Sequence, residues 1–256
     1  MNDVRLTYIG GPTLLLEVAG LRLLSDPTFD PAGTEFRAGA YVLRKTHGPG
    51  LMPASLGRVD AVLLSHDHHF DNLDASGRAF LASAGTVLTT DAGAERLGGN
   101  ARGLVPWQTT ELPAPGGPAL RVTATPAQHG PAHAERGPVV GFVLEHPDTP
   151  GHAIYLSGDT VWFEGVAEVG RRFAVRTAVL FMGAARVAAV GPWHLTFTAE
   201  EGVEAARALA DATIVPVHFE DWEHFSESRP EIDGAFKAAG LGHRLRWLSR
   251  GVETAG

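Results

Sequence analysis

Histidine and aspartate side chains gather in the segment from Leu64 to Asp74, which reads LSHDHHFDNLD. Imidazole and carboxylate groups are standard ligands of zinc, manganese and iron in proteins. His66 and His68 are two residues apart, so in an extended stretch their side chains point the same way. A turn after them would bring Asp71 back toward the same centre. The segment therefore predicts a divalent metal site.

The chain has no cysteine, which excludes disulfides, thiolate nucleophiles and cysteine-bound zinc. A bound divalent ion lowers the pKa of its water from about 15.7 toward about 7, which gives a hydroxide nucleophile at neutral pH. The absence of cysteine fits this chemistry, because it needs no nucleophile from the protein. We expect Asp71 to be a catalytic residue that orients this nucleophile or removes a proton near it.

Three apolar runs predict buried strands that end at residues of the same ligand types. They are Ala61–Ser65 before His66, Ala153–Ser157 before Gly158 and Asp159, and Thr213–Val217 before His218. Buried strands of α/β proteins commonly present functional groups at one end of the sheet. The pattern therefore predicts that these side chains meet at one edge.

Other segments complete the expected fold. Further strands are predicted at Val4–Ile9, Thr13–Val18, Leu21–Ser25, Thr86–Thr90, Leu120–Thr125, Val139–Glu145, Ala178–Met182 and Leu245–Leu248. Helices are predicted at Leu73–Ala84, Glu164–Phe173, Thr198–Ala210 and Pro230–Ala239. Thr198 and Glu201 have the spacing of a capping box. Asp26–Arg58 lacks periodicity and predicts a long loop, either a lid over the site or a packed irregular segment.

The order of the ligand-type residues resembles that of the metallo-β-lactamase superfamily. The resemblance rests on His66-x-His68 with Asp71, then His129, then Asp159 in LSGDT and His218 in VPVHF. The segments TYIGGPTLLLEVAGLRLLSDPTF and WHLTFTAEEGVEAARAL resemble, more narrowly, the branch of ascorbate-phosphate lactonases and N-acyl phosphatidylethanolamine phospholipase D. The resemblance implies an α/β fold, a four-layer αβ/βα sandwich with two β-sheets flanked by helices, as a single domain over residues 1–256.

The resemblance also implies one or two divalent metal ions, zinc or manganese, with iron as an alternative. It implies a first metal held by His66, His68 and His129, and a second held by Asp71, Asp159 and His218, with Asp159 bridging. The chain departs from the family at Asn72, where the family usually has histidine, and by one extra residue before Asp71. This departure leaves open whether the second site is weak, empty or completed by His69.

Four residues outside these sets are further candidates. Asp26 is expected to bind a ligand histidine and fix the orientation of its ring. His194 is expected near the substrate as a catalytic general acid or oxyanion donor, or else to bond a backbone carbonyl. His133 and Arg136 are predicted to bind substrate at the entrance.

The sequence predicts a metal-dependent hydrolase that acts on an ester, lactone or phosphodiester bond of a small molecule. An iron-dependent oxidoreductase on the same scaffold and a catalytically degenerate metal-binding protein stay open as alternatives. The net charge is −8 without a basic run, so no nucleic acid is expected as a partner. No signal-peptide pattern and no apolar run of about 20 residues is present, so we expect a cytoplasmic protein without a membrane span. An oligomer is left open.

Overall fold

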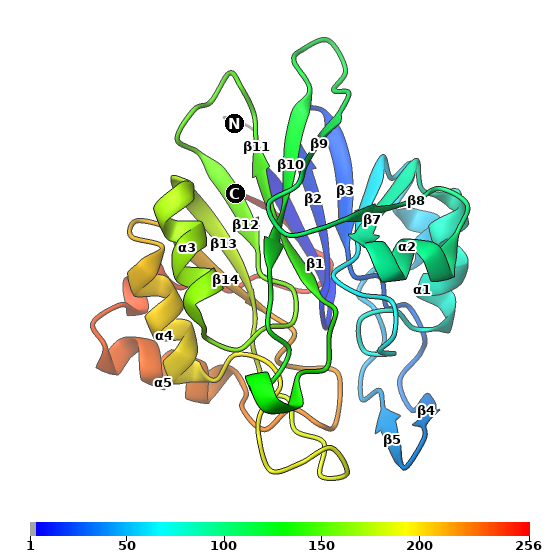
Figure 1. Cartoon of the computed structure of the whole chain (residues 1–256), viewed down its shortest axis with the longest axis vertical. Helices are drawn as coiled ribbons and strands as arrows, with labels where there is room; N and C mark the ends of the chain where they lie inside the picture. The colour runs from blue at the N-terminus through cyan, green and yellow to red at the C-terminus, as the bar shows by residue number, and fades with distance from the viewer. Residues whose placement is uncertain (1–3) are drawn as a thin grey trace.

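Two β-sheets lie face to face in the centre of the molecule, with helices on both outer sides (Figure 1). The structure is a computed structural model that describes residues 4–256. The first sheet contains β1 (Arg5–Gly10), β2 (Thr13–Val18), β3 (Leu21–Ser25), β6 (Ala61–Leu63), β7 (Thr86–Thr90), β8 (Ala101–Leu104) and β15 (Glu253–Ala255). The second contains β9 (Thr109–Leu112), β10 (Leu120–Pro126), β11 (Val140–Glu145), β12 (Ala153–Leu156), β13 (Val175–Phe181) and β14 (Thr213–Val217). Their orders are β15-β1-β2-β3-β6-β7-β8 and β14-β13-β12-β11-β10-β9.

The helices form the outer layers. They are α1 (Ala75–Phe80), α2 (Asp91–Leu97), α3 (Glu164–Arg172), α4 (Ala199–Ala208) and α5 (Arg229–Ala238). Figure 1 shows α1 and α2 beside the first sheet and the other three beside the second. Short 3-10 turns occur at Pro53–Ser55, Leu81–Ser83, Ala132–Ala134 and Gly242–Arg244.

The alternation of side chains along each strand creates these layers. Leu14 and Leu16 of β2 pack with Phe142 of β11 in the core between the sheets. Leu15, between them, points the other way and packs with Leu81 beneath the outer helices. Because successive side chains of a strand face opposite sides, one strand serves two cores. The four-layer αβ/βα sandwich is confirmed.

The predicted strand at Leu245–Leu248 is wrong. Leu245 forms only an isolated bridge with Ile214, and the last strand of the chain is β15, which pairs antiparallel with β1. Leu245 and Trp247 pack against the helical layer of the second sheet, whereas Leu248 packs against the core between the sheets. Packing of single side chains explains this apolar run without a strand.

The predicted loop at Asp26–Arg58 contains a hairpin, β4 (Glu35–Ala38) and β5 (Tyr41–Arg44). Lys45 follows the hairpin and is 2% exposed, and its Nζ lies 2.9 Å from the fully buried Asp74 carboxylate. Asp74 also caps α1 by accepting a hydrogen bond from the Gly77 amide. This ion pair ties the hairpin to the end of the histidine-rich segment.

The strand ends meet as the sequence predicts. β12, β13 and β14 run parallel, as do β3, β6 and β7, so the carboxyl ends of each set share one edge. The capping box at the start of α4 is confirmed: the hydroxyl of Thr198 accepts from the Glu201 amide and the Thr198 amide donates to the Glu201 carboxylate. Among residues 4–256, no helix combines the length and apolarity that crossing a membrane requires.

Candidate metal centre

Two groups of candidate donors lie at the shared edge of the sheets. The first comprises His66, His69 and His129, and the second comprises Asp71, Asp159 and His218. Within each group, the donor atoms lie within 4.8 Å of one another. Nε2 of His129 is 3.6 Å from Oδ2 of Asp159, so the groups adjoin. The arrangement has the form of a centre for one or two cations.

The first group brings together ring nitrogens that cannot all satisfy one another. Nδ1 of His69 is 2.9 Å from Nε2 of His66 and 3.2 Å from Nε2 of His129. Nδ1 of His129 donates to the carbonyl of Leu195 at 2.8 Å, which leaves a lone pair on Nε2 of a neutral ring. If one of these three nitrogens carries a proton, it can form a hydrogen bond with one of the other two, and the third is left without a partner. A cation at their centre would satisfy all three, so these residues fit a metal ion.

A chain of hydrogen bonds sets the orientation of His66. Oδ1 of Asp26 accepts from the amide of Ser65 at 2.9 Å and from its hydroxyl at 2.7 Å. With its proton given to Asp26, the Ser65 hydroxyl accepts from Nδ1 of His66, 2.9 Å away. Nε2 of His66 is then unprotonated and turned toward the other histidines. Asp26 therefore reaches a candidate ligand through Ser65 rather than directly.

Two histidines of the first group, His66 and His69, are held neutral. Burial, reinforced by the neighbouring histidines, lowers the pKa of His66 well below its ordinary value. Burial, reinforced by His129, lowers the pKa of His69 to about 3. Neutral imidazole is the form that binds metals, so this group is ready for an ion at neutral pH.

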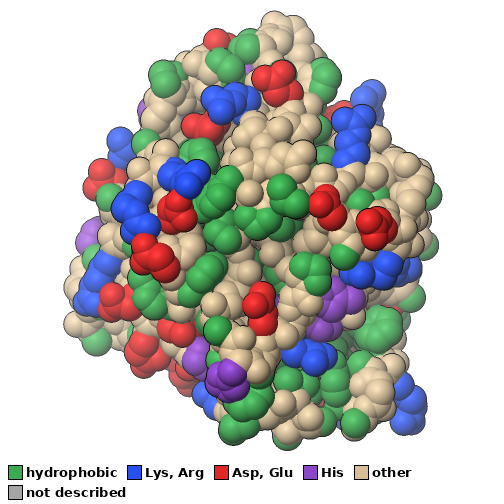
Figure 2. All heavy atoms as spheres, viewed as in Figure 1, with side chains coloured by type: hydrophobic (Ala, Val, Ile, Leu, Met, Phe, Trp, Pro, Cys, Tyr) green, Lys and Arg blue, Asp and Glu red, His purple; other side chains and the backbone are tan. Residues whose placement is uncertain are grey.

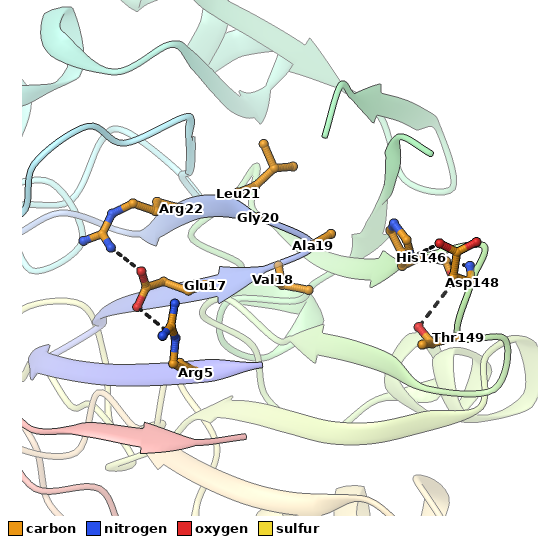
Figure 3. Close-up of a pocket in the computed structure, with 10 residues that line it drawn as sticks. All are labelled: Arg5, Glu17, Val18, Ala19, Gly20, Leu21, Arg22, His146, Asp148 and Thr149. Carbon is orange, nitrogen blue, oxygen red and sulfur yellow. Dashed lines mark hydrogen bonds and ion pairs between the residues drawn. The ribbon is translucent and has the colours of Figure 1, made fainter. Parts of the chain in front are cut away.

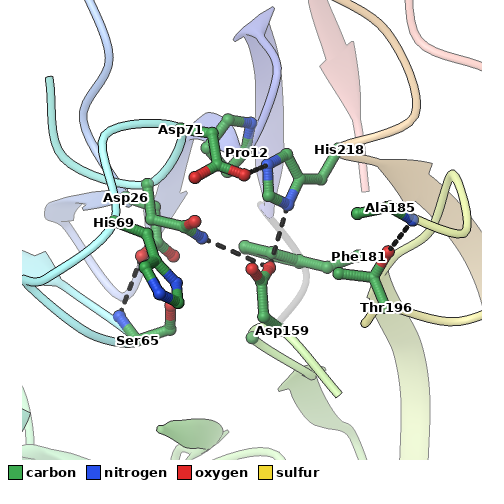
Figure 4. Close-up of polar contacts among 12 residues, drawn as sticks. Pro12, Asp26, Ser65, His69, Asp71, Asp159, Phe181, Ala185, Thr196 and His218 are labelled. Carbon is green, nitrogen blue, oxygen red and sulfur yellow. Dashed lines mark hydrogen bonds and ion pairs between the residues drawn. The ribbon is translucent and has the colours of Figure 1, made fainter. Parts of the chain in front are cut away.

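His218 lies between the two carboxylates of the second group (Figure 4). Its Nδ1 is 2.9 Å from Oδ1 of Asp159, and its Nε2 is 3.5 Å from Oδ2 of Asp71. Burial opposes a charge on His218, but Asp159 and Asp71 outweigh it and raise the pKa of His218 to about 10. Burial likewise opposes ionisation of both carboxylates, yet the nearby histidines lower the pKa of each. The group carries two negative charges against one positive charge, which favours a cation.

Buried polar atoms without partners mark the same place. Among the described residues, Oδ2 of Asp159 and Nε2 of His218 are buried and make no hydrogen bond. Such atoms are costly to bury unless something satisfies them. The backbone of His218 also has φ 55°, a left-handed conformation in which its amide donates a hydrogen bond to the Gly11 carbonyl. Unsatisfied atoms and a strained backbone are typical of a functional site.

His68 does not join either group, although the sequence predicts it in the first. Its Nε2 donates to the carbonyl of Arg136 at 2.8 Å, and its side chain is 26% exposed. His69 stands in the first group instead. The extra residue before Asp71 explains the exchange, because it shifts which histidine the turn presents to the centre.

Asn72 and His224 differ from the expected second site. Asn72 is fully buried, and its Nδ2 donates to Oδ1 of Asp159 at 3.2 Å. His224, which the sequence reading missed, places Nε2 3.0 Å from Oδ2 of Asp71. The available signal was a histidine six residues after His218, in the loop that follows β14.

The remaining candidates lie outside both groups. Nε2 of His194 is 3.1 Å from a carboxylate oxygen of Glu201, the same residue that completes the cap of α4. The ring of His133 packs edge-on against Trp193, with ring centroids 5.0 Å apart. Arg136 lines the cavity beside His69 and His129. The structure therefore places Arg136 in the wall of this cavity and His194 against a structural carboxylate.

A narrow cavity opens onto the donor groups. Its volume is about 20 Å³. The polar part of its lining is His69, Asp71, His129, His224 and Arg136. The rest of the lining is mainly hydrophobic and consists of Tyr41, Leu43, Ala185, Val187, Val190 and Leu195. A groove of about 370 Å³ continues it between β5 and residues 186–189, sharing Tyr41, Leu43, Val187 and His224. Figure 2 shows histidine side chains at the surface with hydrophobic side chains beside them.

A second cavity, of about 500 Å³, lies at the opposite ends of the strands (Figure 3). It is lined by the turn between β2 and β3 and by residues 146–149, and it contains the ion pairs of Glu17 with Arg5 and Arg22. None of the six donors lines it. The narrow cavity is therefore the candidate reaction site, although it is the smaller one.

A family model described as "Beta-lactamase superfamily domain" matches residues 21–219. The chain belongs to the metallo-β-lactamase superfamily. A UPF0173 metal-dependent hydrolase of Opitutus terrae is 31% identical over 261 residues, which cover 97% of this chain and 98% of that protein. The chain therefore also belongs to the UPF0173 metal-dependent hydrolases, and it is an enzyme of this class.

Two solved structures have a similar fold. The isothiocyanate hydrolase from Delia radicum gut bacteria superposes with a TM-score of 0.82 and 27% identity, covering 98% of this chain and 99% of that chain. CmlA, a diiron β-hydroxylase from Streptomyces venezuelae, has a TM-score of 0.70 and 15% identity, covering 100% of this chain and 55% of that chain. The second likeness is one of fold only.

Metal uptake by the hydrolase is expected to release about one proton for each ion bound at the second group. His218, with a pKa near 10, is protonated at pH 7, and it must lose this proton to become a ligand. His66 and His69 are already neutral and would release none. Below pH 10, the affinity for that ion should therefore rise about tenfold for each pH unit. Titration calorimetry in buffers of different ionisation enthalpy measures the proton count, and a count of zero would contradict this account.

Proposed function

We propose that the chain hydrolyses a small, uncharged ester or lactone at a metal centre built from His66, His69, His129, Asp71, Asp159 and His218. The observation that carries the proposal is the narrow, mainly hydrophobic cavity that ends at these donors. Its volume of about 20 Å³ has room for one group of about the size of a water molecule. The reactive carbonyl would enter it, and the rest of the substrate would lie in the adjoining groove.

The lining of the cavity favours carbon over phosphorus as the point of attack. Arg136 is the one lysine or arginine side chain among the residues that line the inner cavity. Apart from the site residues His69, Asp71, His129 and His224, its other walls are aliphatic or aromatic. A phosphodiester would have to carry its own negative charge past these hydrophobic walls, where desolvation is costly, and only the bound ion and Arg136 would offset that charge. Two kinds of substrate are supported by the sequence likeness to ascorbate-phosphate lactonases and N-acyl phosphatidylethanolamine phospholipase D, namely a lactone and a phosphodiester. Of these two, the lining of the cavity favours the lactone.

The residues of the site would divide the work between binding and orientation. A divalent ion bound here would supply Lewis acidity and would ease the ionisation of a water molecule. Asp71 would orient the attacking water, because its pKa lies well below the ordinary value and suits a hydrogen-bond acceptor better than a general base. Tyr41, Leu43 and Val187 would exclude bulk water from the reacting carbonyl.

Isothiocyanate hydrolysis is a second candidate. It is favoured by the TM-score of 0.82 and the 27% identity with the isothiocyanate hydrolase. An isothiocyanate is compact and uncharged and has an electrophilic carbon, so it meets the same requirements of the cavity as an ester or lactone. Esters, lactones and isothiocyanates can therefore be compared in the same assay.

A substrate panel tests the proposal directly. Short-chain esters, γ-lactones, alkyl isothiocyanates and an aryl phosphodiester are assayed with the metal-loaded enzyme, and again after chelation and reloading with zinc, manganese or iron. We expect at least one carbon substrate to exceed the phosphodiester about tenfold or more in kcat/KM, which corresponds to about 1.4 kcal/mol. Chelation should abolish turnover, and reloading should restore it.

Three outcomes would contradict the proposal. Preference for the phosphodiester would reverse the choice of reacting atom. Oxygen consumption by the iron-loaded enzyme would favour the oxidoreductase alternative. Absence of turnover across the panel with a fully loaded centre would favour a catalytically degenerate metal-binding protein.

A further inference from the structure

Asn72 is poorly suited to replace the histidine that the family usually has at this position. Its Nδ2 donates to Asp159, and an amide nitrogen has no lone pair to offer a metal. Its Oδ1 is buried and makes no hydrogen bond among the described residues. A neutral amide oxygen suits zinc or iron less well than imidazole does. The second group therefore lacks one nitrogen ligand in the segment where the family provides it.

His224 approaches the same group from another part of the chain. Its Nε2 lies 3.0 Å from Oδ2 of Asp71, and Nε2 of His218 lies 3.5 Å from that oxygen. The side chain of His224 is 9% exposed and lines the cavity together with His69 and His129. Its other ring nitrogen, Nδ1, is buried and has no partner within residues 4–256. A nearly buried imidazole is thus turned toward the centre, and within residues 4–256 Asp71 is the one hydrogen-bond partner of its ring nitrogens.

Backbone hydrogen bonds fix His224 in this position. The Arg186 amide donates to the carbonyl of His224 at 2.8 Å, and the Glu223 amide donates to the carbonyl of Arg44 at 3.1 Å. The ring packs against Phe225, with centroids 4.7 Å apart. These contacts come from β5, from the loop after β13 and from the loop after β14. A side chain supported in this way is preorganised to bind an ion without rearrangement.

We propose that His224 is a ligand of the second metal, in place of the histidine that the family has where this chain has Asn72. The inference rests on the proposed metal centre. It goes beyond it, because it predicts that two ions bind, whereas Asn72 in place of histidine would by itself suggest that only one ion binds. Asp71, Asp159, His218 and His224 then form the second ligand set. The loop after β14 supplies two ligands instead of one.

Cobalt binding tests the proposal without relying on activity. The metal-free enzyme is titrated with Co²⁺, and the stoichiometry, the affinity and the d–d absorption bands are measured for each equivalent. The variants are His224→Ala and His224→Gln, where glutamine keeps a hydrogen-bond donor for Asp71 but not the imidazole. His152→Ala is the matched control, because His152 is an exposed histidine at the opposite end of the strands. Metal-free melting temperatures show whether each variant folds.

We expect the unmodified enzyme and His152→Ala to bind two equivalents. Both His224 variants should bind the first ion normally, lose about tenfold or more in affinity for the second, and lose its spectral bands. Asn72→His in the His224→Ala background should restore the second ion. If His224→Ala does not fold, the cobalt titration of His224→Gln shows whether His224 binds the second ion.

The outcomes separate this inference from the proposed function. Unchanged affinity and spectrum of the second ion in His224→Gln would show that His224 only bonds Asp71, which overturns the inference alone. A single equivalent in the unmodified enzyme would also overturn it and would leave the first metal in place. No bound metal in the unmodified enzyme would overturn the metal centre itself.

Discussion

His69→Ala is expected to remove the metal and the hydrolase activity together, whereas His68→Ala should retain most of both. The ring of His69 contacts both other histidines of the first group, while His68 is bonded to the Arg136 carbonyl. Loss of a residue that merely supports a ligand costs about 10–100-fold in affinity or activity. Loss of His69 should therefore lower kcat/KM more than about a hundredfold, and loss of His68 less than about tenfold. Metal analysis and steady-state kinetics of the two variants measure the difference.

The comparison is well matched because the two histidines are adjacent in the chain. Both substitutions remove one imidazole from the same turn, so a general disturbance of the turn would affect both variants alike. Equal losses in both would indicate such a disturbance. A greater loss of metal and activity in His68→Ala would contradict the structure and would support His66 and His68 as the ligand pair, as the sequence motif suggests.

Lys45→Met is expected to lower the free energy of unfolding by about 3–5 kcal/mol, the range seen when one partner of a buried ion pair is removed. The reason is that the fully buried Asp74 carboxylate would lose the ammonium group that pairs with it 2.9 Å away. Methionine preserves most of the apolar stem, so the loss reports mainly on the charge. Urea denaturation followed by circular dichroism measures it.

A double variant provides the control. Lys45→Met combined with Asp74→Asn removes both charges, while the asparagine oxygen can still accept the capping bond from Gly77. We expect this variant to be more stable than Lys45→Met alone, because no unpaired charge stays buried. If the double variant is the less stable of the two, packing of the lysine stem outweighs the charge and the explanation fails.

Much of the fold could be predicted because strand periodicity and helix caps are local signals. The runs at Ala61–Ser65, Ala153–Ser157 and Thr213–Val217 correspond to β6, β12 and β14, and each leads into a candidate donor. The α4 cap could be predicted from Thr198 and Glu201 alone. These features depend on residues that are close in sequence.

What could not be predicted depends on contacts between distant residues. Each strand of the β4–β5 hairpin has only 4 residues, too few for a clear alternation signal, and its position is tied to the Lys45 and Asp74 pair. The choice between His68 and His69 depends on how one turn accommodates an extra residue. His224 gains its importance only from its approach to Asp71, 153 positions earlier in the chain. The place of His224 soon after His218 marks it as a nearby histidine, but spacing along the sequence does not show that it meets Asp71.

The order of the donors along the chain also bears on how the enzyme matures during synthesis. The first group is complete once residue 129 has left the ribosome, whereas the second group needs residue 218. The first sheet gains its last edge strand, β15, only from the final residues, which pair with β1. A nascent chain therefore contains the three histidines, and then the Leu195 carbonyl that holds His129, before it contains His218. The order in which translation delivers the donors thus favours filling of the two positions in sequence.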